Sequence, residues 1–481
     1  MKSCEKLFFV FIILIGARIF AQAGGSIAAS DARSSAMGKT SNESSLGLYA
    51  LGNNPANLLW DSQKKIELIV PLPFPKISGS AGTNFITLDE YNYFFGYKTK
   101  DSNGNDVGRY LNGADKERLK NLFADGGSVT MNAQMQLFAV SIKPGNDFGV
   151  VAFSISDVIS SNAAFPKGII DLGMDGNLAN RVYNFNDTQM KSWWLRKYSL
   201  SYARNLNFLP VFKSVSFGIS LNLINGFAYA GLDHINTELQ TGTGNVITGK
   251  GDFLAHSAFS PDFNVKYNFD STYQKKDFRF SLFPTPAGTG LGIDFGLSAK
   301  LNEAWSFGFA ITDIGSVAWN KNVAEYSSNK AVYLNDLSSK SQRDSLENAL
   351  TGKDSGKYIN EISTQLATAF RFGAALLLDK FLAGNFPGRM LVAFDYNQGF
   401  NDQPGNSTKP RFSVGADWML GTIALRTGFS FGGFDKFNWG FGAGLDFDFL
   451  ELNFGTADMQ SAVAPNSAKR ITFAMDSRWK F

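Results

Sequence analysis

The sequence contains very few of the residues that build reactive centres in soluble enzymes. It has one cysteine, Cys4, and two histidines, His234 and His256, among 481 residues. Because Cys4 lies in a segment predicted to be removed, the mature chain should contain no thiol, which excludes disulfides, thiolate metal sites and cysteine nucleophiles. Both histidines lie in one predicted long loop, far in the sequence from any Gly-x-Ser-x-Gly elbow, and no His-Glu-x-x-His zinc motif is present. We therefore expect no enzyme, no cofactor and no metal, although one histidine would suffice for a hydrolase triad.

Long apolar runs are also missing after the N-terminus, and neither sign of charge is in large excess. No later segment approaches the ~18 consecutive apolar residues of a transmembrane helix, so any membrane crossing has to be made by strands. The formal net charge is +3, and no basic patch of the kind that binds nucleic acid is visible.

The N-terminus has the pattern of a secretory signal. Lys2 and Lys6 are basic, residues 7–17 are apolar, and Ala21-Gln22-Ala23 supplies small residues for cleavage. We predict a signal peptide over residues 1–23 and a mature chain that begins near Gly24. An uncleaved N-terminal helix is the alternative.

Three stretches, 213–224, 290–300 and 438–447, alternate strictly with a period of two. In each, one parity is apolar and often aromatic, while the other is small or polar and rich in glycine or serine. A strand with lipid on one side and a wet lumen on the other has this pattern. A soluble sandwich also alternates, but its outer face is seldom made of rows of glycine.

The whole chain is therefore predicted to be all-β, as a transmembrane antiparallel barrel of about fourteen strands. The expected strands are 66–81, 128–143, 147–158, 192–206, 212–225, 288–300, 304–315, 365–379, 388–399, 410–420, 422–431, 438–449, 450–457 and 470–481. Their connections alternate between tight turns, such as Leu420-Gly421, and long external loops at 82–127, 159–191, 226–287 and 316–364, as in outer-membrane barrels. The barrel domain then covers residues 63–481, and both chain ends face the periplasm.

Two of the long loops are expected to contain further structure. A hairpin of Phe263–Asp270 against Lys276–Leu282 would raise the strand count to about sixteen if it crossed the membrane. Helices are predicted after Asp115 and after Ser341, which have the chemistry of N-caps. Loose solvated loops are the alternative for the second.

The last predicted strand ends in an aromatic residue on its apolar parity. Trp479 and the terminal Phe481 lie on that parity. This ending resembles the signal by which the barrel-assembly machinery recognises its substrates, and it implies that machinery as a partner beside outer-membrane lipid.

A second motif follows the predicted cleavage site. Residues 31–38 read Asp-Ala-Arg-Ser-Ser-Ala-Met-Gly, and residues 51–58 read Leu-Gly-Asn-Asn-Pro-Ala-Asn-Leu. With the barrel pattern behind them, these stretches resemble the FadL-like outer-membrane proteins, a superfamily that includes long-chain fatty-acid transporters and PorV-like secretion proteins. The resemblance implies an N-terminal hatch folded inside the barrel, with its candidate residues at Met37, Gly38, Asn53, Asn54, Pro55 and Ala56.

The residues themselves also favour a hatch over 24–62. This segment is rich in Ser, Ala, Gly and Asn and too weakly periodic for a lipid-facing strand. A barrel of about fourteen strands is wide enough to hold it, and Pro55 would fix a turn. A disordered periplasmic tail is the alternative.

Charged residues of both signs fall on the parity predicted to line the lumen. Such residues form mutual pairs or hatch contacts more often than catalytic sites. The predicted lining residues are Asp294, Lys300, Arg371, Asp395, Asp417, Arg426, Asp446 and Arg478.

These features predict a multi-pass protein of a Gram-negative-type outer membrane that transports hydrophobic small molecules, such as long-chain fatty acids. An apolar ligand would enter near Trp193, Trp194, Phe227 and Tyr229 and pass when the hatch shifts. The alternative is a PorV-like protein that binds or delivers secretion-system proteins through loops such as 316–364. A barrel without transport is a third possibility.

Overall fold

The structure is a computed structural model. It describes residues 31–60, 64–96, 98–100, 103–145, 148–175, 178–206, 211–267, 269–270, 281–336, 339–352, 355–382, 386–433 and 436–481. The predicted signal peptide and cleavage site lie outside these residues. Within the described part of the chain, no helix is both long and apolar enough to cross a membrane.

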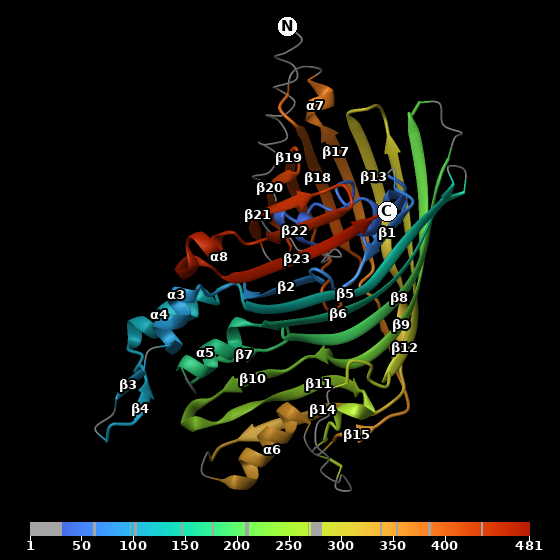
Figure 1. The fold of residues 1–481 in the computed structure, drawn as a ribbon. Helices are drawn as coiled ribbons and strands as arrows, with labels where there is room; N and C mark the ends of the chain where they lie inside the picture. The colour runs from blue at the N-terminus through green and yellow to red at the C-terminus, as the bar shows by residue number, and fades with distance from the viewer. Residues whose placement is uncertain are drawn as a thin grey trace.

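Fourteen antiparallel strands close into a barrel (Figure 1). The first strand has two parts, and both pair with the last strand, which closes the sheet. The barrel strands are β1 (Ile66–Ile69) with β2 (Lys76–Thr83), β5 (Gly127–Gly145), β6 (Gly149–Phe165), β8 (Gln189–Asn205), β9 (Ser214–Ile235), β12 (Gly288–Lys300), β13 (Trp305–Trp319), β17 (Ala369–Leu377), β18 (Arg389–Gly399), β19 (Arg411–Leu420), β20 (Ile423–Gly432), β21 (Phe437–Asp446), β22 (Leu450–Thr456) and β23 (Arg470–Lys480).

The outer surface of the barrel is apolar, and this makes it a membrane-spanning barrel of the outer-membrane type. Leu221, Leu291 and Phe441 are exposed on the outward parity, whereas Asn222, Gly292 and Gly442 on the other parity are buried. A soluble protein would hide such a belt, but in a membrane the belt contacts lipid. The predicted barrel, its strand count and its alternation are confirmed.

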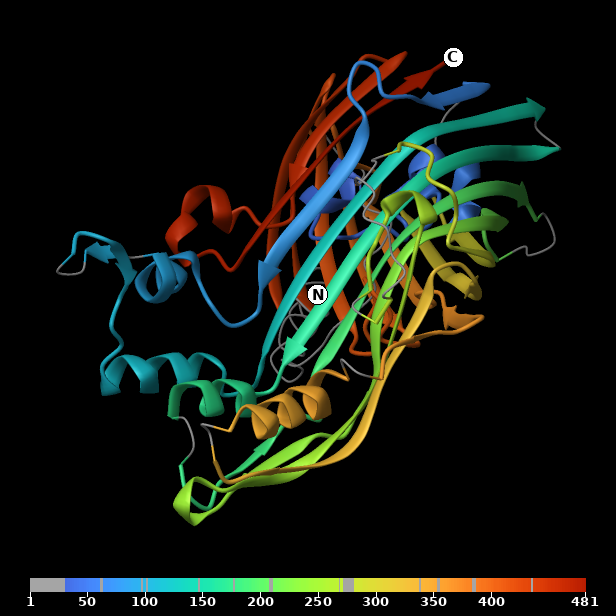
Figure 2. The ribbon, with the colours of Figure 1, turned by 90° about the horizontal axis from the view of Figure 1, so that it is seen from below.

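The sheet extends well beyond the barrel on one side. β9 continues outward to pair with β11 (Ile247–Phe259), which pairs with β14 (Val323–Leu334) along twelve residue positions. The additional strands are β3 (Lys98–Lys100), β4 (Asp106–Gly108), β7 (Val182–Asn184), β10 (Glu238–Thr241), β15 (Lys357–Tyr358) and β16 (Ile362–Gln365). We call the external sheet of β7, β10, β11, β14 and β15 the extension (Figures 1 and 2). The predicted loops 226–287 and 316–364 were therefore partly wrong, because these strands lack the lipid-facing alternation used to find strands.

The predicted hairpin in this region is not formed as expected. The short helical turn η5 (Pro261–Phe263) ends where the first predicted strand was expected to begin, and residues 264–267 and 269–270 form no strand. Residues 276–280 lie outside the described residues. The strand that runs through this part of the sequence is β11, which belongs to the extension. The membrane barrel accordingly has fourteen strands rather than sixteen.

Short helices lie mainly outside the barrel. They are α2 (Ala32–Ala36), α3 (Leu88–Tyr91), α4 (Gly113–Leu122), α5 (Lys167–Asp175), α6 (Lys340–Thr351), α7 (Leu378–Phe381) and α8 (Gln460–Val463), with single helical turns η1 (Gly47–Ala50), η2 (Pro55–Leu59), η3 (Asn92–Gly96), η4 (Thr243–Asn245) and η6 (Pro465–Ser467).

The two predicted external helices form, but both predicted caps were wrong. Asn112 caps α4, and Asp115 is the third residue of the helix, where its carboxylate accepts the backbone N–H of Asn112. A capping box uses polar residues at both positions, so the inner one was mistaken for the cap. Ser341 lies inside α6, whose cap position is Ser339.

The end of the chain contributes to barrel closure. The backbone N–H groups of Lys65 and Ile66 donate to the carbonyl of Phe481 over 2.8 and 3.0 Å. The Phe481 ring stacks with Trp479 at a centroid distance of 6.4 Å. The terminal residue therefore has both a backbone role, which the sequence did not predict, and an aromatic ring on the outward face.

The backbone and ring roles of Phe481 can be separated by substitution. Phe481→Ala keeps the carbonyl and removes the ring, so it should lower the amount of folded barrel in the outer membrane several-fold if the ring is the assembly signal. Heat-dependent mobility on gels measures the folded fraction, and Val463→Ala, at an exposed external residue, is the control. Normal assembly of Phe481→Ala would show that the ring is not the signal.

Candidate functional site

Residues 31–60 lie inside the barrel, where almost all of them are buried (Figure 2). We call this part of the chain the lumenal segment. It consists of short turns because its residues favour caps over long helices. Asp31 caps α2 by accepting the N–H of Ser34 over 2.6 Å. Asn54 caps η2, and Pro55 occupies the first turn, where its missing N–H costs nothing.

The glycine rows of the inner wall are explained by the lumenal segment. A side-chain carbon built on Gly428 would lie 2.3 Å from the carbonyl carbon of Met37, and one built on Gly218 would lie 2.3 Å from the backbone nitrogen of Ala56. Gly38 itself has a φ of +65° and packs against the backbone of Phe429. Backbone therefore touches backbone, which any larger residue would prevent.

Carboxylates of the barrel wall bind the backbone of the lumenal segment. Asp395 accepts the N–H groups of Ser41 and Asn42 over 2.6 and 2.8 Å. Asp476 accepts the N–H of Ala32 over 2.7 Å and the hydroxyl of Tyr49 over 2.6 Å. These bonds satisfy N–H groups that no helix or sheet satisfies, and charged acceptors make them strong.

Ion pairs add to this attachment. Arg33 lies 2.9 Å from Asp417, which is also 3.1 Å from Arg426 in the wall. Arg478 lies between Glu67 and Glu451 and donates to the carbonyl of Leu46. The charges on both sides are buried, so the loss of one partner would leave the other without compensation.

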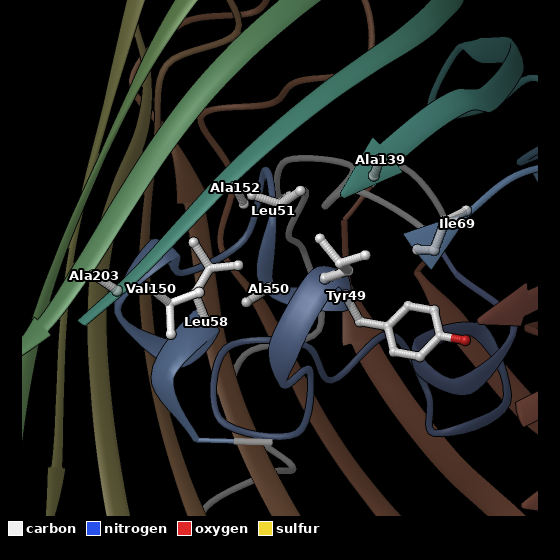
Figure 3. Close-up of a cluster of buried hydrophobic side chains, with 10 residues drawn as sticks. Tyr49, Ala50, Leu51, Leu58, Ile69, Ala139, Val150, Ala152 and Ala203 are labelled. Atoms are coloured by element: carbon white, nitrogen blue, oxygen red, sulfur yellow. The ribbon is translucent and has the colours of Figure 1, made fainter. Parts of the chain in front are cut away.

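The contact with the first wall strands is apolar (Figure 3). Leu48, Tyr49, Ala50, Leu51 and Leu58 of the lumenal segment form one cluster with wall side chains. Those side chains come from β1, β5, β6 and β8 and are Ile69, Ala139, Val150, Ala152 and Ala203.

The predicted hatch residues all belong to this interface or support it. Met37 is buried against Ala375 and Ala393. The amide of Asn54 donates to the carbonyl of Leu297 over 3.1 Å, and the carbonyl of Ala56 accepts the hydroxyl of Ser216. Asn53 lies one turn earlier, and its side chain donates to the carbonyl of Tyr49.

The eight predicted lining residues lie on the lumen parity, but they do not form one site. Asp395, Asp417, Arg426 and Arg478 belong to the network around the lumenal segment. Asp294 and Arg371 line a cavity beside it. Lys300 lies over the ring of Trp60 at 4.3 Å, and Asp446 pairs with Lys480 over 2.7 Å.

Several residues of this network were missed in the sequence. Asp476 and Glu451 lie on predicted strands and on the lumen parity, so the period of two could have identified both as inward-facing. Their partners are in the lumenal segment or on other strands, and no local pattern points to those partners. Glu43 was missed for another reason, because the hatch motif does not include it.

A cavity lies on the external side of the lumenal segment. Its volume is about 100 Å³, and Leu51 and Gly52 of the lumenal segment line it from below. The wall comes mainly from β5, β6, β8 and β9, and it is mixed. Its hydroxyl, amide and ammonium groups belong to Gln134, Gln136, Ser154, Ser156, Ser160, Lys197, Ser199, Ser201, Ser220 and Asn222, and its apolar side chains include Met135, Val158, Trp193, Leu195 and Leu366.

The cavity exists because the inward side chains change along each strand. Outward from the periplasmic end, β6 presents Val150 and Ala152 to the lumenal segment and then Ser154 and Ser156 to the cavity. β9 presents Ser216 and then Ser220 in the same way. Chain order therefore places a layer of hydroxyl and amide groups directly above the layer that packs on the lumenal segment.

The aromatic residues predicted at the entrance are divided between two places. Trp193 lines the cavity. Trp194 and Phe227 pack edge to face at 5.1 Å, whereas Tyr229 packs on Trp319 at 5.5 Å in the same apolar cluster as Trp193. His256 lies on β11 of the extension, where it contacts Asp233 and Glu325, and His234 lies near the end of β9, 3.5 Å from Asp252. The four aromatic residues therefore do not form one entrance pocket.

Glu43 in the lumenal segment is a buried carboxyl group. Within the described residues, no Lys or Arg nitrogen lies within ion-pair distance of it. Burial raises its pKa to about 7, although hydrogen bonds from Ser298, Ser306 and Asn57 oppose the shift. The charged groups that face it are Asp395 on β18 and Lys300 on β12.

The docked lumenal segment should therefore loosen as the pH rises. A carboxyl group whose pKa is raised stabilises docking fully below its exposed pKa, and this contribution is lost as the pH passes the docked value. Between pH 5 and pH 8 we expect protease cleavage of the lumenal segment to accelerate about tenfold or more. Glu43→Gln should flatten this dependence. An unchanged pH profile in the Gln variant would contradict the assignment.

The glycine contact predicts a second way to loosen the segment. Gly428→Ala places a methyl group where the Met37 carbonyl lies, and such overpacking costs about 1–3 kcal/mol. We expect cleavage of the lumenal segment to be about tenfold faster, while the barrel keeps its heat-dependent gel mobility. Gly145→Ala, where nothing lies within 4 Å of the new carbon, is the matched control, and equal cleavage in the two variants would refute the contact.

Comparison with known proteins gives a family but no assigned activity. Residues 62–457 match the model described as "Family of unknown function (DUF5723)". No curated protein matches.

Distant similarity to solved barrels is found along nearly the whole chain. The Pseudomonas putida toluene transporter TodX has 13% identity and a TM-score of 0.45, covering 94% of this chain and 98% of its own. The Ralstonia pickettii toluene transporter TbuX has 11% identity and a TM-score of 0.42, with coverage of 94% and 98%.

Proposed function

The chain belongs to the family of unknown function DUF5723, and we propose that it is an outer-membrane channel gated by its lumenal segment. In this proposal the lumenal segment blocks the path to the periplasm, and a small molecule collects in the cavity above it. Movement of the segment opens the path. No covalent chemistry is needed.

One observation carries the proposal: the lumenal segment is attached to the wall without sharing its sheet. Within the described residues, residues 31–60 pair with no strand of the barrel. The attachment consists of side-chain bonds, such as Asp395 to Ser41, and of close packing. These contacts can break while the closed ladder of strand hydrogen bonds stays intact, so the path can open without unfolding the barrel.

The cargo predicted from the sequence is hydrophobic, with long-chain fatty acids as the example. The hatch motif supports this prediction. The cavity lining is mixed, and its serines favour a more polar cargo, because an acyl chain placed against Ser154, Ser156 and Ser199 would remove water from their hydroxyls without replacing its hydrogen bonds. Hydrophobic transport therefore stays a prediction, and both cargo classes belong in the test.

The alternative of a PorV-like protein that binds secretion-system proteins also stays a prediction. Its predicted docking region, 316–364, contains β14 and α6, which pack into the extension. A built external surface is compatible with a partner, but the cavity directly above the lumenal segment has no role in that alternative.

The gate can be tested by removing side-chain contacts that attach the lumenal segment to the barrel wall. Arg33→Met removes the ion pair with Asp417, and Tyr49→Phe removes the hydroxyl that Asp476 accepts. Asp417 keeps Arg426 as a partner, so the wall retains its own pair. We expect the double variant to conduct ions in planar bilayers at least about tenfold more often than the parent chain, since each charged bond contributes about 1.5–3 kcal/mol.

The control for this experiment is Lys64→Ala, which breaks an exposed ion pair with Asp448 outside the lumenal segment. Its conductance should equal that of the parent chain. If the double variant folds, releases its lumenal segment to protease and still conducts no more than the parent, the gating proposal fails.

A further inference from the structure

The cavity above the lumenal segment is lined by an ordered array of hydrogen-bonding groups on adjacent strands. Ser154 on β6 lies opposite Ser199 on β8, and Ser199 lies opposite Asn222 on β9. Neighbouring positions in such a row are about 5 Å apart. One residue pair further toward the periplasm, Ser201 and Ser220 are also in register and share a hydrogen bond of 2.7 Å.

Many of these groups have no protein partner. Within the described residues, the hydroxyls of Ser154, Ser156 and Ser199 and the amide of Gln136 make no side-chain hydrogen bond. The indole N–H of Trp193, a residue only 4% exposed at the cavity wall, also lacks an acceptor. Buried polar groups are normally paired, so an indole N–H at this place indicates a ligand or water that accepts from it.

The charged residues of the cavity wall already have partners in the protein, including Lys76, which lies over the ring of Tyr49 at 5.3 Å, and Arg371, whose Nε donates to the hydroxyl of Thr312 over 3.3 Å. Lys197 pairs with Asp313, Asp157 lies 2.6 Å from Arg196, and Asp294 accepts hydrogen bonds from the amide of Asn222 and the N–H of Asp313. The wall also contains equal numbers of acidic and basic residues. An ionic solute would find no single uncompensated counter-charge, whereas a neutral solute with many hydroxyls finds donors and acceptors.

Apolar groups complete the lining. Trp193, Met135 and Leu366 lie among the polar residues of the wall. A sugar ring presents C–H groups on its faces and hydroxyls around its edge, so it can use both kinds of surface.

We infer that this cavity binds a small neutral saccharide, with Ser154, Ser199, Asn222 and the Trp193 indole N–H as recognition groups. The inference names the solute for the proposed channel, and only the passage of that solute rests on the proposed function. Binding itself needs the cavity alone.

Binding can be measured on the full-length protein in detergent. Isothermal titration with sucrose, maltotriose and chitobiose should show saturable one-to-one binding of at least one of them, and palmitate is titrated in parallel. Ser154→Ala with Ser199→Ala should weaken that binding about tenfold or more, because two facing hydroxyls are lost. Trp193→Phe, which removes the N–H and keeps a ring, should weaken it as well.

The chain offers a matched control. Ser413 and Ser430 are another pair of facing lumen serines, on β19 and β20 away from the cavity. The Ser413→Ala with Ser430→Ala variant should bind the saccharide like the parent chain, and gel mobility shows that each variant is folded. The inference is overturned if no saccharide binds, if both serine pairs have equal effects, or if palmitate is the ligand that the cavity variant loses.

Failure of the inference and failure of the channel can be told apart in liposomes. If saccharide binds but its uptake is the same in the Arg33→Met, Tyr49→Phe variant and the parent, the site stands and the gate fails. If no saccharide binds but the variant conducts ions, the gate stands and the inference fails.

Discussion

Enclosing an irregular segment inside a barrel requires partners for its backbone polar groups, and most of the lumen follows from that requirement. Residues 31–60 form short turns that leave many N–H groups unpaired, and water is largely excluded around them. Wall carboxylates such as Asp395 and Asp476 accept these N–H groups. Burying a carboxylate costs free energy because the charge loses its water. The hydrogen bonds that it accepts from several backbone N–H groups offset this cost.

The need to enclose the lumenal segment also explains why the inner wall differs between the regions that contact this segment and the region that lines the cavity. Where backbone meets backbone, as at Gly428 and Gly218, the wall has no side chains, and the lumenal segment fits closely. Where the wall carries alanine and valine, as at Ala152 and Val150, the contact is apolar. The external halves of β5, β6, β8 and β9 carry hydroxyls and amides beyond the lumenal segment, and the cavity opens there.

The barrel was predictable from the sequence because every barrel strand has the same two environments. Lipid on one side and lumen on the other produce a period of two, and residues 290–300 show it without exception. The extension was missed because β11 has no lipid-facing side, so its residues do not alternate in the same way. The caps of α4 and α6 were misplaced by two or three residues, since polar residues stand at several positions of each helix start.

The site could be predicted only in part. The lumen parity identified Asp395 and Asp417 as inward-facing, and the Asn-Pro-Ala turn lies in the segment that occupies the lumen. The pairings themselves join positions as far apart as Ser41 and Asp395, separated by 354 residues, and no local pattern encodes such a pair. The cavity was not predicted either. The sequence identifies a serine as inward-facing, but it does not show whether another segment packs on that serine or leaves it facing a cavity.

The floor of the cavity couples solute binding to the position of the lumenal segment. Leu51 and Gly52 line the cavity and belong to the lumenal segment, which blocks the path in the proposed channel. A solute that touches them has different contacts when the segment is docked and when it has moved, and a ligand shifts an equilibrium only through such a difference. Contacts made to Ser154 and Ser199 are the same in both positions, so they can hold a solute without opening the path. Recognition therefore resides in the wall, and any control of the gate by solute has to act through the floor.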